Sequence, residues 1–358
     1  MARQKSHIDT DVLTEAKKRI RHIYDTHDNV AVAFSGGKDS TVTINLVNQV
    51  LREMGEDKEV DIFFRDQEII PSSILDNVKY YMDKPWANLT WYAVPLKSYK
   101  HILGNSKTVV FWDPSGDREW MRPKPDWAET LDDTESIHTT GTIDNVVARQ
   151  YKGTVGIITG IRASESLRRY RAVVNKLTDN YINRSPHNTR VTLCKPIFDW
   201  EMNDVFKYFM DFEIPYTSWY EQQLWSGDTL RVDQPLNPEN SQKLDLWAKA
   251  DPEFYDRLSQ IFPEVRAQER YIKDIDTKHL FETYGKDLDG VEKWVNANIP
   301  KNTRAYQEAM KELNRIRRRA KTQPTRWLPG GNAEYVLREF MKGTYKRQLQ
   351  PYRHIDGK

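Results

Sequence analysis

One short stretch, residues 30–40, constrains the fold of this chain more than any other. An apolar run over 30–34, Val-Ala-Val-Ala-Phe, stops at Ser-Gly-Gly-Lys-Asp-Ser over 35–40, and a helical pattern follows to Arg52. This order predicts a buried strand, a tight turn and the start of a helix. Gly36 and Gly37 permit positive φ angles and let backbone amides approach a ligand closely.

The same stretch carries the chemistry of an anion site. Free amides at a helix N-terminus attract negative charge, and Lys38 adds a full positive charge. Ser35 and Ser40 offer hydroxyl groups to phosphate oxygens or to an ion. The spacing of the Walker phosphate loop is absent. We therefore predict a polyphosphate site of another kind; the alternative is a strand, turn and helix with incidental glycines.

Signals for short strands and for helices alternate through the first part of the chain. The alternation predicts an α/β fold: a mainly parallel twisted sheet with right-handed crossovers and helices on both faces. The predicted strands cover 30–34, 60–64, 89–94, 155–159 and 191–194, and the predicted helices cover 9–28, 41–52, 71–81, a segment from about Ala163, and 201–212.

Strand signals fade beyond about Pro215. Helices are predicted there near 238–250, 252–260, 263–275, 284–297 and 303–320. We therefore expect an α/β nucleotide-binding domain over 1–215 and a mostly α-helical C-terminal region over 216–358. An irregular insertion at about 104–135, rich in Pro, Trp, Asp and Gly, exceeds ordinary loop lengths, so we expect it to be functional or mobile.

The positive charge of the chain is concentrated at one end. The formal net charge is only +2, yet residues 301–358 contain 15 Lys and Arg against 5 Asp and Glu. Within this tail the basic cluster comprises Arg315, Arg317, Arg318, Arg319 and Lys321. Such asymmetry predicts contact with a nucleic acid, and the alternative is a solvated helix with a basic face.

No apolar run approaches the length of a membrane span, and the N-terminus has no signal-peptide pattern. We therefore expect a cytoplasmic protein that does not enter a membrane. The eight histidines show no spacing typical of metal ligands.

Polar residues follow two of the predicted strands, where ligands of open α/β sheets bind. Asp66 and Glu68 follow the second strand and are candidates for ribose hydroxyls or Mg²⁺, which prefers oxygen ligands. The alternative is a polar turn that caps the next helix.

The strand that ends at Thr159 leads into a second candidate. Gly160 opens a turn, and Arg162, Arg168 and Arg169 bring guanidinium groups suited to phosphate or sulfate. Ser164 or Ser166 would donate to the same anion, whereas in the alternative interpretation Ser164 caps a helix with a salt-bridged basic face.

Taken together, these motifs resemble a known family. In order and spacing over about 30–220, they resemble the phosphoadenosine phosphosulfate (PAPS) reductase branch of the PP-loop ATP pyrophosphatase superfamily. The motifs are Ser35–Ser40, Gly160–Arg162 with Glu165, Ser166 and Arg169, and Lys195–Trp200 with Asp204 and Val205. The resemblance implies an adenine nucleotide alpha hydrolase-like fold that binds ATP, or a PAPS-like adenine nucleotide, together with Mg²⁺.

The resemblance also suggests roles for individual residues. Lys38, Asp39 and Arg162 become the catalytic candidates, with Arg162 near the substrate anion and Asp39 as a candidate Mg²⁺ ligand. The candidates for nucleotide binding are Ser35, Gly36, Gly37, Ser40, Asp66, Glu68, Gly160, Glu165, Ser166 and Arg169. By default, Asp199 is structural and caps the next helix.

A weaker resemblance extends towards residue 260. It rests on Asp66–Glu68, Trp120–Pro123 and Gln234-Pro235, and points to PAPS reductase-like proteins, some of which accompany a ParB-like partner.

Cysteine usage departs from the family. Reductases of this branch attack sulfur with a C-terminal cysteine thiolate, and no cysteine follows Cys194, the only one in the chain. One cysteine cannot supply an iron–sulfur cluster. We expect Cys194 to be buried and structural, although Lys195 beside it would lower the pKa of an exposed thiol. Sulfate reduction by this chain is therefore disfavoured.

Three functional hypotheses follow. The leading one is an enzyme that binds ATP and Mg²⁺ and adenylates a substrate with release of pyrophosphate, in nucleotide or nucleic-acid modification. The second is a sulfotransferase or reductase that uses PAPS or adenylyl sulfate with an external thiol. The third is a non-catalytic nucleotide-binding regulator that acts with a ParB-like partner.

Overall fold

The computed structural model describes residues 9–102, 105–131, 136–165, 169–170, 173, 181–228, 230–238, 240–271, 282–285, 287–323, 332–341, 343–346 and 348–350. Contacts within the chain define two compact units, each built from separate segments. Unit 1 contains Met1–Ser98, Val110–Gln234 and Leu246–Ile261, and unit 2 contains Tyr99–Val109, Pro235–Asp245 and Phe262–Lys358.

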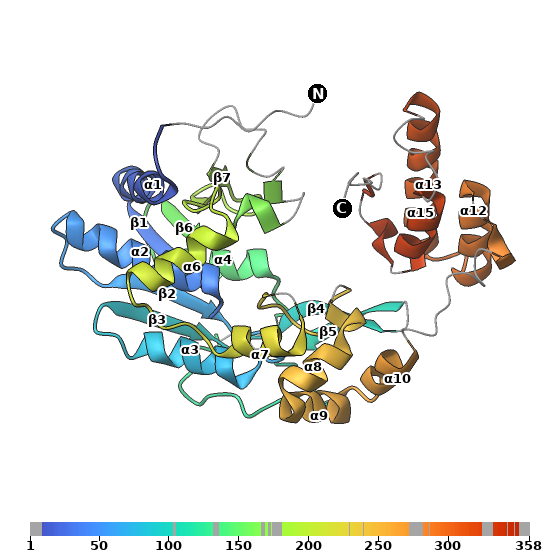
Figure 1. Cartoon of the computed structure of the whole chain (residues 1–358), viewed down its shortest axis with the longest axis horizontal. Helices are drawn as coiled ribbons and strands as arrows, with labels where there is room; N and C mark the ends of the chain where they lie inside the picture. The colour runs from blue at the N-terminus through green and yellow to red at the C-terminus, as the bar shows by residue number, and fades with distance from the viewer. Residues whose placement is uncertain are drawn as a thin grey trace. The chain divides into compact units, whose positions relative to one another are not determined.

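Unit 1 is built on a six-stranded sheet with the strand order β3-β2-β1-β6-β8-β7 (Figure 1). All neighbours run parallel except β7 and β8, so the predicted mainly parallel sheet is confirmed. The strands are β1 (Asn29–Phe34), β2 (Val60–Arg65), β3 (Ala87–Tyr92), β6 (Val155–Thr159), β7 (Ile182–Arg184) and β8 (Val191–Cys194). Strand β7 is an antiparallel edge strand that the sequence pattern did not predict.

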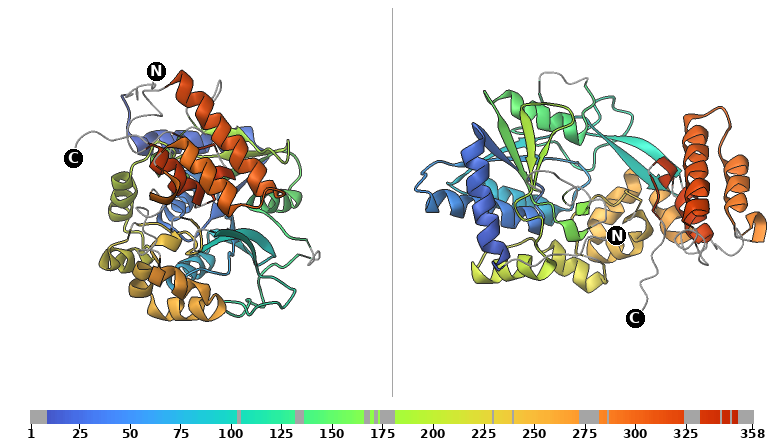
Figure 2. Two further views of the ribbon diagram at one scale, coloured as in Figure 1. Left: turned by 90° about the vertical axis from the view of Figure 1, so that its right-hand side faces the viewer. Right: turned by 90° about the horizontal axis from the view of Figure 1, so that it is seen from above.

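Helices cover both faces of the sheet. One face carries α1 (Val12–Thr26), α2 (Lys38–Glu53) and α6 (Met202–Asp211), and α2 contacts both of the others. Helix α4 (Thr140–Arg149), which was not predicted, lies on the opposite face (Figure 2). Strand β1 is buried on both faces, from Val30 to Phe34, as expected for an inner strand of a parallel sheet.

Three more helices belong to unit 1. Helices α3 (Ser72–Met82) and α9 (Pro252–Ile261) lie within one residue of their predicted bounds, and α7 (Trp219–Ser226) was not predicted. Helix α8 (Leu244–Ala250) is shorter than predicted. Ile74 of α3, Trp219 of α7 and Trp247 of α8 form one buried cluster, which fixes the segment around α7 against α3.

One local prediction was wrong. Part of the insertion expected to be irregular is a strand, because β4 (Leu96–Ile102) and β5 (Asn105–Phe111) form a two-stranded sheet. The helix expected from about Ala163 begins with a 3-10 turn, η1 (Ala163–Glu165), and the described residues Arg169, Tyr170 and Val173 are helical.

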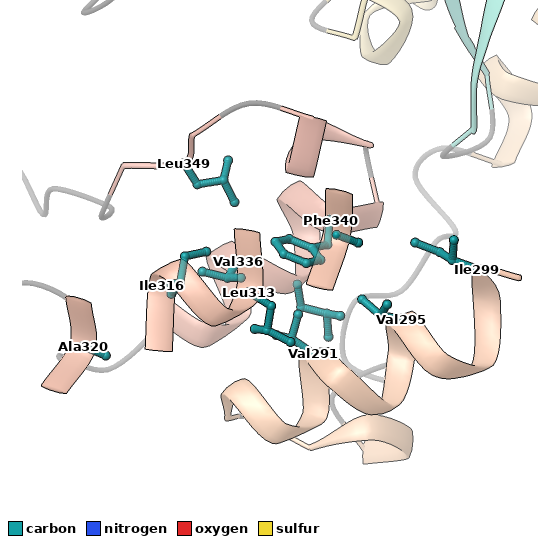
Figure 3. Packing of buried hydrophobic residues seen from close by; sticks show 11 residues of the cluster. Val291, Val295, Ile299, Leu313, Ile316, Ala320, Val336, Phe340 and Leu349 are labelled. Carbon is teal, nitrogen blue, oxygen red and sulfur yellow. The ribbon is translucent and has the colours of Figure 1, made fainter. Parts of the chain in front are cut away.

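In unit 2, three helices surround one apolar core. Helices α12 (Leu288–Asn298), α13 (Arg304–Thr322) and α15 (Asn332–Met341) contribute Val291, Leu313 and Phe340, each with no exposed surface (Figure 3). Helix α10 (Glu264–Tyr271) and the 3-10 turns η2 (Asn240–Gln242) and η3 (Thr344–Lys346) complete the described elements. The predicted helical character of the C-terminal region is confirmed. Among the described residues, no helix has the length and apolar character needed to cross a bilayer.

Candidate functional site

The loop Ser35–Ser40 lies at the carboxyl end of β1, where the strand order reverses between β1 and β6. In open α/β sheets, ligands bind in the crevice at this reversal. Gly36 has φ +73°, and a Cβ atom there would lie 2.7 Å from Ile74 Cγ2 of α3. Glycine is therefore required at this turn both by its backbone angle and by the lack of space.

The loop presents several amides that the protein itself leaves unused. Helix α2 begins at Lys38, and its N-cap, Gly37, has no side chain to satisfy the first amides. Among the described groups, none accepts a hydrogen bond from the amides of Gly36, Asp39 or Ser40. The Ser35 and Ser40 hydroxyl oxygens lie 3.0 Å apart beside them. The loop is thus a preformed cradle of donors for an anion.

One amide of the cradle is already occupied. The Lys38 amide donates to the Tyr220 hydroxyl oxygen at 2.6 Å. Tyr220 belongs to α7, far along the chain, and was not among the predicted site residues. No local sequence signal distinguishes this tyrosine from an ordinary core residue.

The three predicted catalytic residues meet at one carboxylate. Arg162 Nε donates to Asp39 Oδ1 at 2.5 Å, and Lys38 Nζ donates to Asp39 Oδ2 at 2.9 Å. The Lys38 and Arg162 side chains are both 3% exposed, so these ion pairs are shielded from water. The structure thus brings the three candidates together, while their catalytic roles stay a prediction.

Lys38 points its ammonium group into the protein. Besides Asp39, its Nζ donates to the Leu230 carbonyl at 3.1 Å. Burial lowers the pKa of Lys38, and the neighbouring Asp39 opposes this shift. In this arrangement Lys38 neutralises Asp39 and holds the segment at Leu230.

Gly160 brings the end of β6 against the phosphate loop. A Cβ atom at Gly160 would lie 2.8 Å from Asp39 C and O and from Ser40 N. Because these are backbone atoms, no side-chain movement would relieve the contact. Only glycine allows the end of β6 to approach the first turn of α2 this closely.

A second group of cations follows Gly160. Glu165 accepts from the Arg162 amide at 3.1 Å and pairs with Arg169, and its carbonyl accepts from Arg231 Nη2 at 3.0 Å. Arg231 was missed by the sequence analysis because it lies outside the motifs considered. Ser166 and Arg168 lie outside the described residues, so their predicted roles stay predictions.

Asp66 and Glu68 bind protein groups in this structure. Asp66 accepts from the Trp91 indole at 2.8 Å and from Arg122 Nη2 at 2.5 Å. Glu68 is fully buried and accepts from both terminal nitrogens of Arg118, each at 2.6 Å. The amides of Trp112 and Met121 also donate to Glu68, at 2.7 and 2.9 Å.

These contacts anchor the segment 112–122 on the residues that follow β2. Every carboxylate oxygen of Asp66 and Glu68 has a donor from the protein. The geometry therefore favours a structural role for both residues, and their predicted contact with ribose or Mg²⁺ stays untested.

A cleft of about 270 Å³ opens beside this anchor. Ile70, Leu75 and Phe254 supply apolar walls, and the charged lining is mixed: it comprises Arg122, Arg257, Glu68, Asp251 and Glu253. On α3, Leu75 lines the cleft while its neighbour Ile74 lies against Gly36. The cleft is thus close to the phosphate loop and is large enough for part of a small molecule.

Asp39 does not fit the predicted role of a Mg²⁺ ligand in this arrangement, because each of its oxygens is paired with a cation. Within the described part of the chain, no group of three or more His, Cys, Asp or Glu side chains is placed to hold a metal ion.

Cys194 is buried in β8, as predicted. It has no exposed surface, and burial raises the pKa of its thiol to about 11. The thiol is therefore protonated at neutral pH and is a poor nucleophile.

Comparison with known proteins places this chain in a family. Residues 29–258 match the family described as the phosphoadenosine phosphosulfate reductase domain. The chain is 26% identical over 261 residues to the uncharacterized protein YbdN of Escherichia coli (strain K12), covering 68% of this chain and 63% of YbdN. It is 25% identical over 205 residues to the uncharacterized protein MJ0066 of Methanocaldococcus jannaschii, covering 54% of this chain and 34% of that protein.

Solved structures with partial likeness include two enzymes from yeasts. FMN adenylyltransferase from Candida glabrata, in complex with FAD and inorganic pyrophosphate, has a TM-score of 0.43 and 10% identity over 65% of this chain and 66% of that chain. PAPS reductase from Candida auris has a TM-score of 0.36 and 15% identity over 64% of this chain and 97% of that chain. On the match over residues 29–258, the chain belongs to the phosphoadenosine phosphosulfate reductase domain family of the PP-loop superfamily.

Proposed function

We propose that this protein is a cytoplasmic ATP-dependent adenylating enzyme, which transfers AMP to an acceptor and releases pyrophosphate. The observation that carries the proposal is the cradle at Ser35–Ser40. The amides of Gly36, Asp39 and Ser40, which have no acceptor among the described groups, lie with the exposed Ser35 hydroxyl at the strand-order reversal, while the Ser40 hydroxyl bonds the Gly37 carbonyl. A preorganised set of donors stabilises developing negative charge without reorganisation during the reaction.

In the proposed reaction, the phosphates of ATP lie on the cradle. An acceptor oxygen or nitrogen attacks the α-phosphorus, the bond from that phosphorus to the bridging oxygen breaks, and pyrophosphate leaves with the electron pair. Arg162, Arg169 and Arg231 form the cationic side of the site and would stabilise the leaving pyrophosphate. Positioning and electrostatics therefore carry the step.

Lys38 and Mg²⁺ have supporting roles in the proposed reaction. Lys38 would position the loop through Asp39 and Leu230. A divalent cation would arrive with the phosphates of ATP, because Asp39 is already paired. The cleft lined by Leu75 and Phe254 is the proposed place for the acceptor or the nucleoside.

The buried thiol of Cys194 argues against sulfur chemistry by the chain itself. A sulfotransferase or reductase with an external thiol is the alternative enzyme. The two reactions have different products and can be told apart by assay. For the proposed adenylating enzyme we expect exchange of labelled pyrophosphate into ATP and no release of sulfite from PAPS. Sulfite release without exchange would replace the adenylation proposal with the alternative.

The exchange assay has a matched pair of variants. Ser35 is exposed on the cradle, and Ser115 is an exposed serine whose hydroxyl also accepts one long amide hydrogen bond. Ser35→Ala is expected to reduce exchange about tenfold, and Ser115→Ala is expected to leave it unchanged. Equal exchange in both variants would contradict the placement of phosphates on the loop.

For the acceptor, we propose a nucleic acid or nucleotide that contacts α13. Arg318, Arg319 and Lys321 are exposed on this helix, whereas Arg315 and Arg317 are paired with acidic neighbours. The third hypothesis, a regulator that acts with a ParB-like partner, predicts ATP binding without exchange of pyrophosphate.

A further inference from the structure

The first amide of helix α2 is satisfied by a side chain that comes from another part of the fold. Tyr220 of α7 accepts this hydrogen bond from Lys38 at 2.6 Å, while the neighbouring amides of Gly36, Asp39 and Ser40 have no acceptor among the described groups. A free helix N-terminus would offer the Lys38 amide to a bound anion. The hydroxyl therefore stands where a phosphate oxygen would otherwise bind.

The tyrosine ring is held in place on several sides. Tyr220 is 2% exposed, and Lys38 Nζ lies 5.3 Å from the centre of its ring. A Cβ atom at Gly37 would lie 3.1 Å from the hydroxyl oxygen and 3.2 Å from Val232. The preceding residue, Trp219, belongs to the buried cluster with Ile74. An incoming phosphate would have to break this packing to displace the hydroxyl.

The hydroxyl still has a proton to give. A phenol has one donor and two acceptor positions, and the Lys38 amide uses an acceptor position. Among the described residues, no group accepts the proton of Tyr220. Burial also raises the pKa of Tyr220, so the proton stays on the oxygen at neutral pH.

We infer that Tyr220 is a phosphate-positioning residue, whose hydroxyl accepts from the Lys38 amide and donates its own proton to a phosphate oxygen of the bound nucleotide. This inference rests on the proposed function, because it requires the phosphates to lie on the cradle. It adds a donor from α7 to the donors of the loop, so that the α7 segment takes part in nucleotide recognition. In the contrary case, the Tyr220 hydroxyl would compete with phosphate for the Lys38 amide.

Calorimetric titration of ATP, inorganic pyrophosphate and adenosine into the full chain tests the inference. Tyr220→Phe keeps the ring and removes the donor, so affinity for ATP and pyrophosphate is expected to fall about tenfold, with no change for adenosine. Tyr208→Phe is the matched control, because Tyr208 is also buried and its hydroxyl bonds Gln49, away from the loop. This control is expected to bind all three ligands as the wild type does.

The outcomes distinguish a failure of the inference about Tyr220 from a failure of the proposed function. Unchanged or tighter binding of ATP and pyrophosphate by Tyr220→Phe overturns the role of the hydroxyl and leaves the cradle standing. Wild-type protein that binds neither ligand at millimolar concentration overturns the proposed function, and the inference falls with it.

A structure of the wild-type chain with ATP gives a second test, which does not depend on folding of the variant. The hydroxyl oxygen is expected within about 3.2 Å of a phosphate oxygen. A ring that has moved away from Lys38, with phosphate on the amide, overturns the inference.

Discussion

Arg162 and Asp39 join the two strand ends that frame the site. Arg162 follows β6, and Asp39 lies at the start of α2. The Arg162 Nε atom donates a hydrogen bond to Asp39 Oδ1 at 2.5 Å. Lys38 takes the other carboxylate oxygen at 2.9 Å. Beside this pair, the Gly160 backbone lies directly against the Asp39–Ser40 peptide. The phosphate loop is thus fixed by an ion pair and by a backbone contact from the same neighbouring strand.

Loss of the Arg162 guanidinium should destabilise the fold as well as the site. Arg162→Gln leaves a largely buried carboxylate with a single cationic partner, so the free energy of unfolding in urea is expected to fall by about 3 kcal/mol. In the double variant with Asp39→Asn, the two losses are not expected to add, because Arg162 and Asp39 contact each other; the buried Lys38 ammonium is then left without a carboxylate partner. Strictly additive losses would show that the two side chains do not interact as described.

Gly36→Ala should lower the free energy of unfolding more than the same change at a glycine whose Cβ position is free of contacts. Gly36 and Gly55 have φ angles of +73° and +76°, but a Cβ atom meets Ile74 at Gly36 and nothing within 4 Å at Gly55. Gly55→Ala is expected to lower the free energy of unfolding by about 1–2 kcal/mol, and Gly36→Ala by at least about 3 kcal/mol.

Thermal and urea unfolding compare these two glycine variants directly. Similar losses at both sites would mean that the loop and α3 are packed less tightly than described. ATP affinity provides a second comparison, since only the change at Gly36 disturbs the cradle.

The segment 112–122 should loosen when its anchor is changed. Glu68→Gln replaces a carboxylate that receives two hydrogen bonds from Arg118, so a loss of about 3 kcal/mol in urea unfolding is expected. Limited proteolysis should then cut within 112–122 sooner than in the wild type. Glu129→Gln, at an exposed position, is the control and should change stability by less than about 0.5 kcal/mol.

Cys194 makes stability depend on alkaline pH. The folded thiol keeps its proton up to about pH 11, whereas the ordinary value is 9.0. An unfolded chain therefore releases this proton first as the pH rises, and the free energy of unfolding falls between about pH 9 and 11. The contribution is complete below pH 9, and its loss amounts to about 3 kcal/mol.

The difference between wild type and Cys194→Ala isolates this effect from the tyrosines that titrate in the same range. The stability advantage of the wild type should be constant below pH 9 and shrink above it. A difference that stays flat to pH 11 would contradict the raised pKa of the thiol.

Binding of a nucleic acid through α13 should depend on the exposed cations. Changing Arg318, Arg319 and Lys321 together to Gln is expected to weaken binding at least about tenfold at low salt and to reduce the salt slope. Changing Lys18, Lys58 and Lys79, which are exposed in unit 1, removes the same charge elsewhere. Equal losses in the two triple variants in a gel-shift titration would assign the binding to net charge alone.

Local signals were sufficient to predict the central sheet and the turn at Ser35–Ser40. Strand β1, the turn at Gly36 and helix α2 depend on adjacent residues, so the sequence pattern contains nearly all the information. Lys38, Asp39 and Arg162 were each predicted as catalytic candidates, and the carboxyl ends of neighbouring parallel strands bring them together at one edge. Their ion pairs with one another were not predicted.

The remaining features depend on contacts between distant segments. Tyr220 reaches the loop only because Trp219 packs against α3, and no periodicity near α7 indicates this contact. The contacts of Asp66 with Arg122 and of Glu68 with Arg118 could not be predicted, because both arginines lie in a segment without regular pattern. The strand β5 was missed for a related reason, since its sequence, Asn105–Phe111, alternates only weakly.

The burial of the single thiol has a practical consequence for following α7 in solution. A cysteine introduced at an exposed position becomes the one thiol that reacts readily with a maleimide dye at neutral pH. Trp225 is 83% exposed on the helix that carries Tyr220, so Trp225→Cys would place a fluorophore there without a cysteine-free background. Its emission would then follow the helix in real time as nucleotide is added.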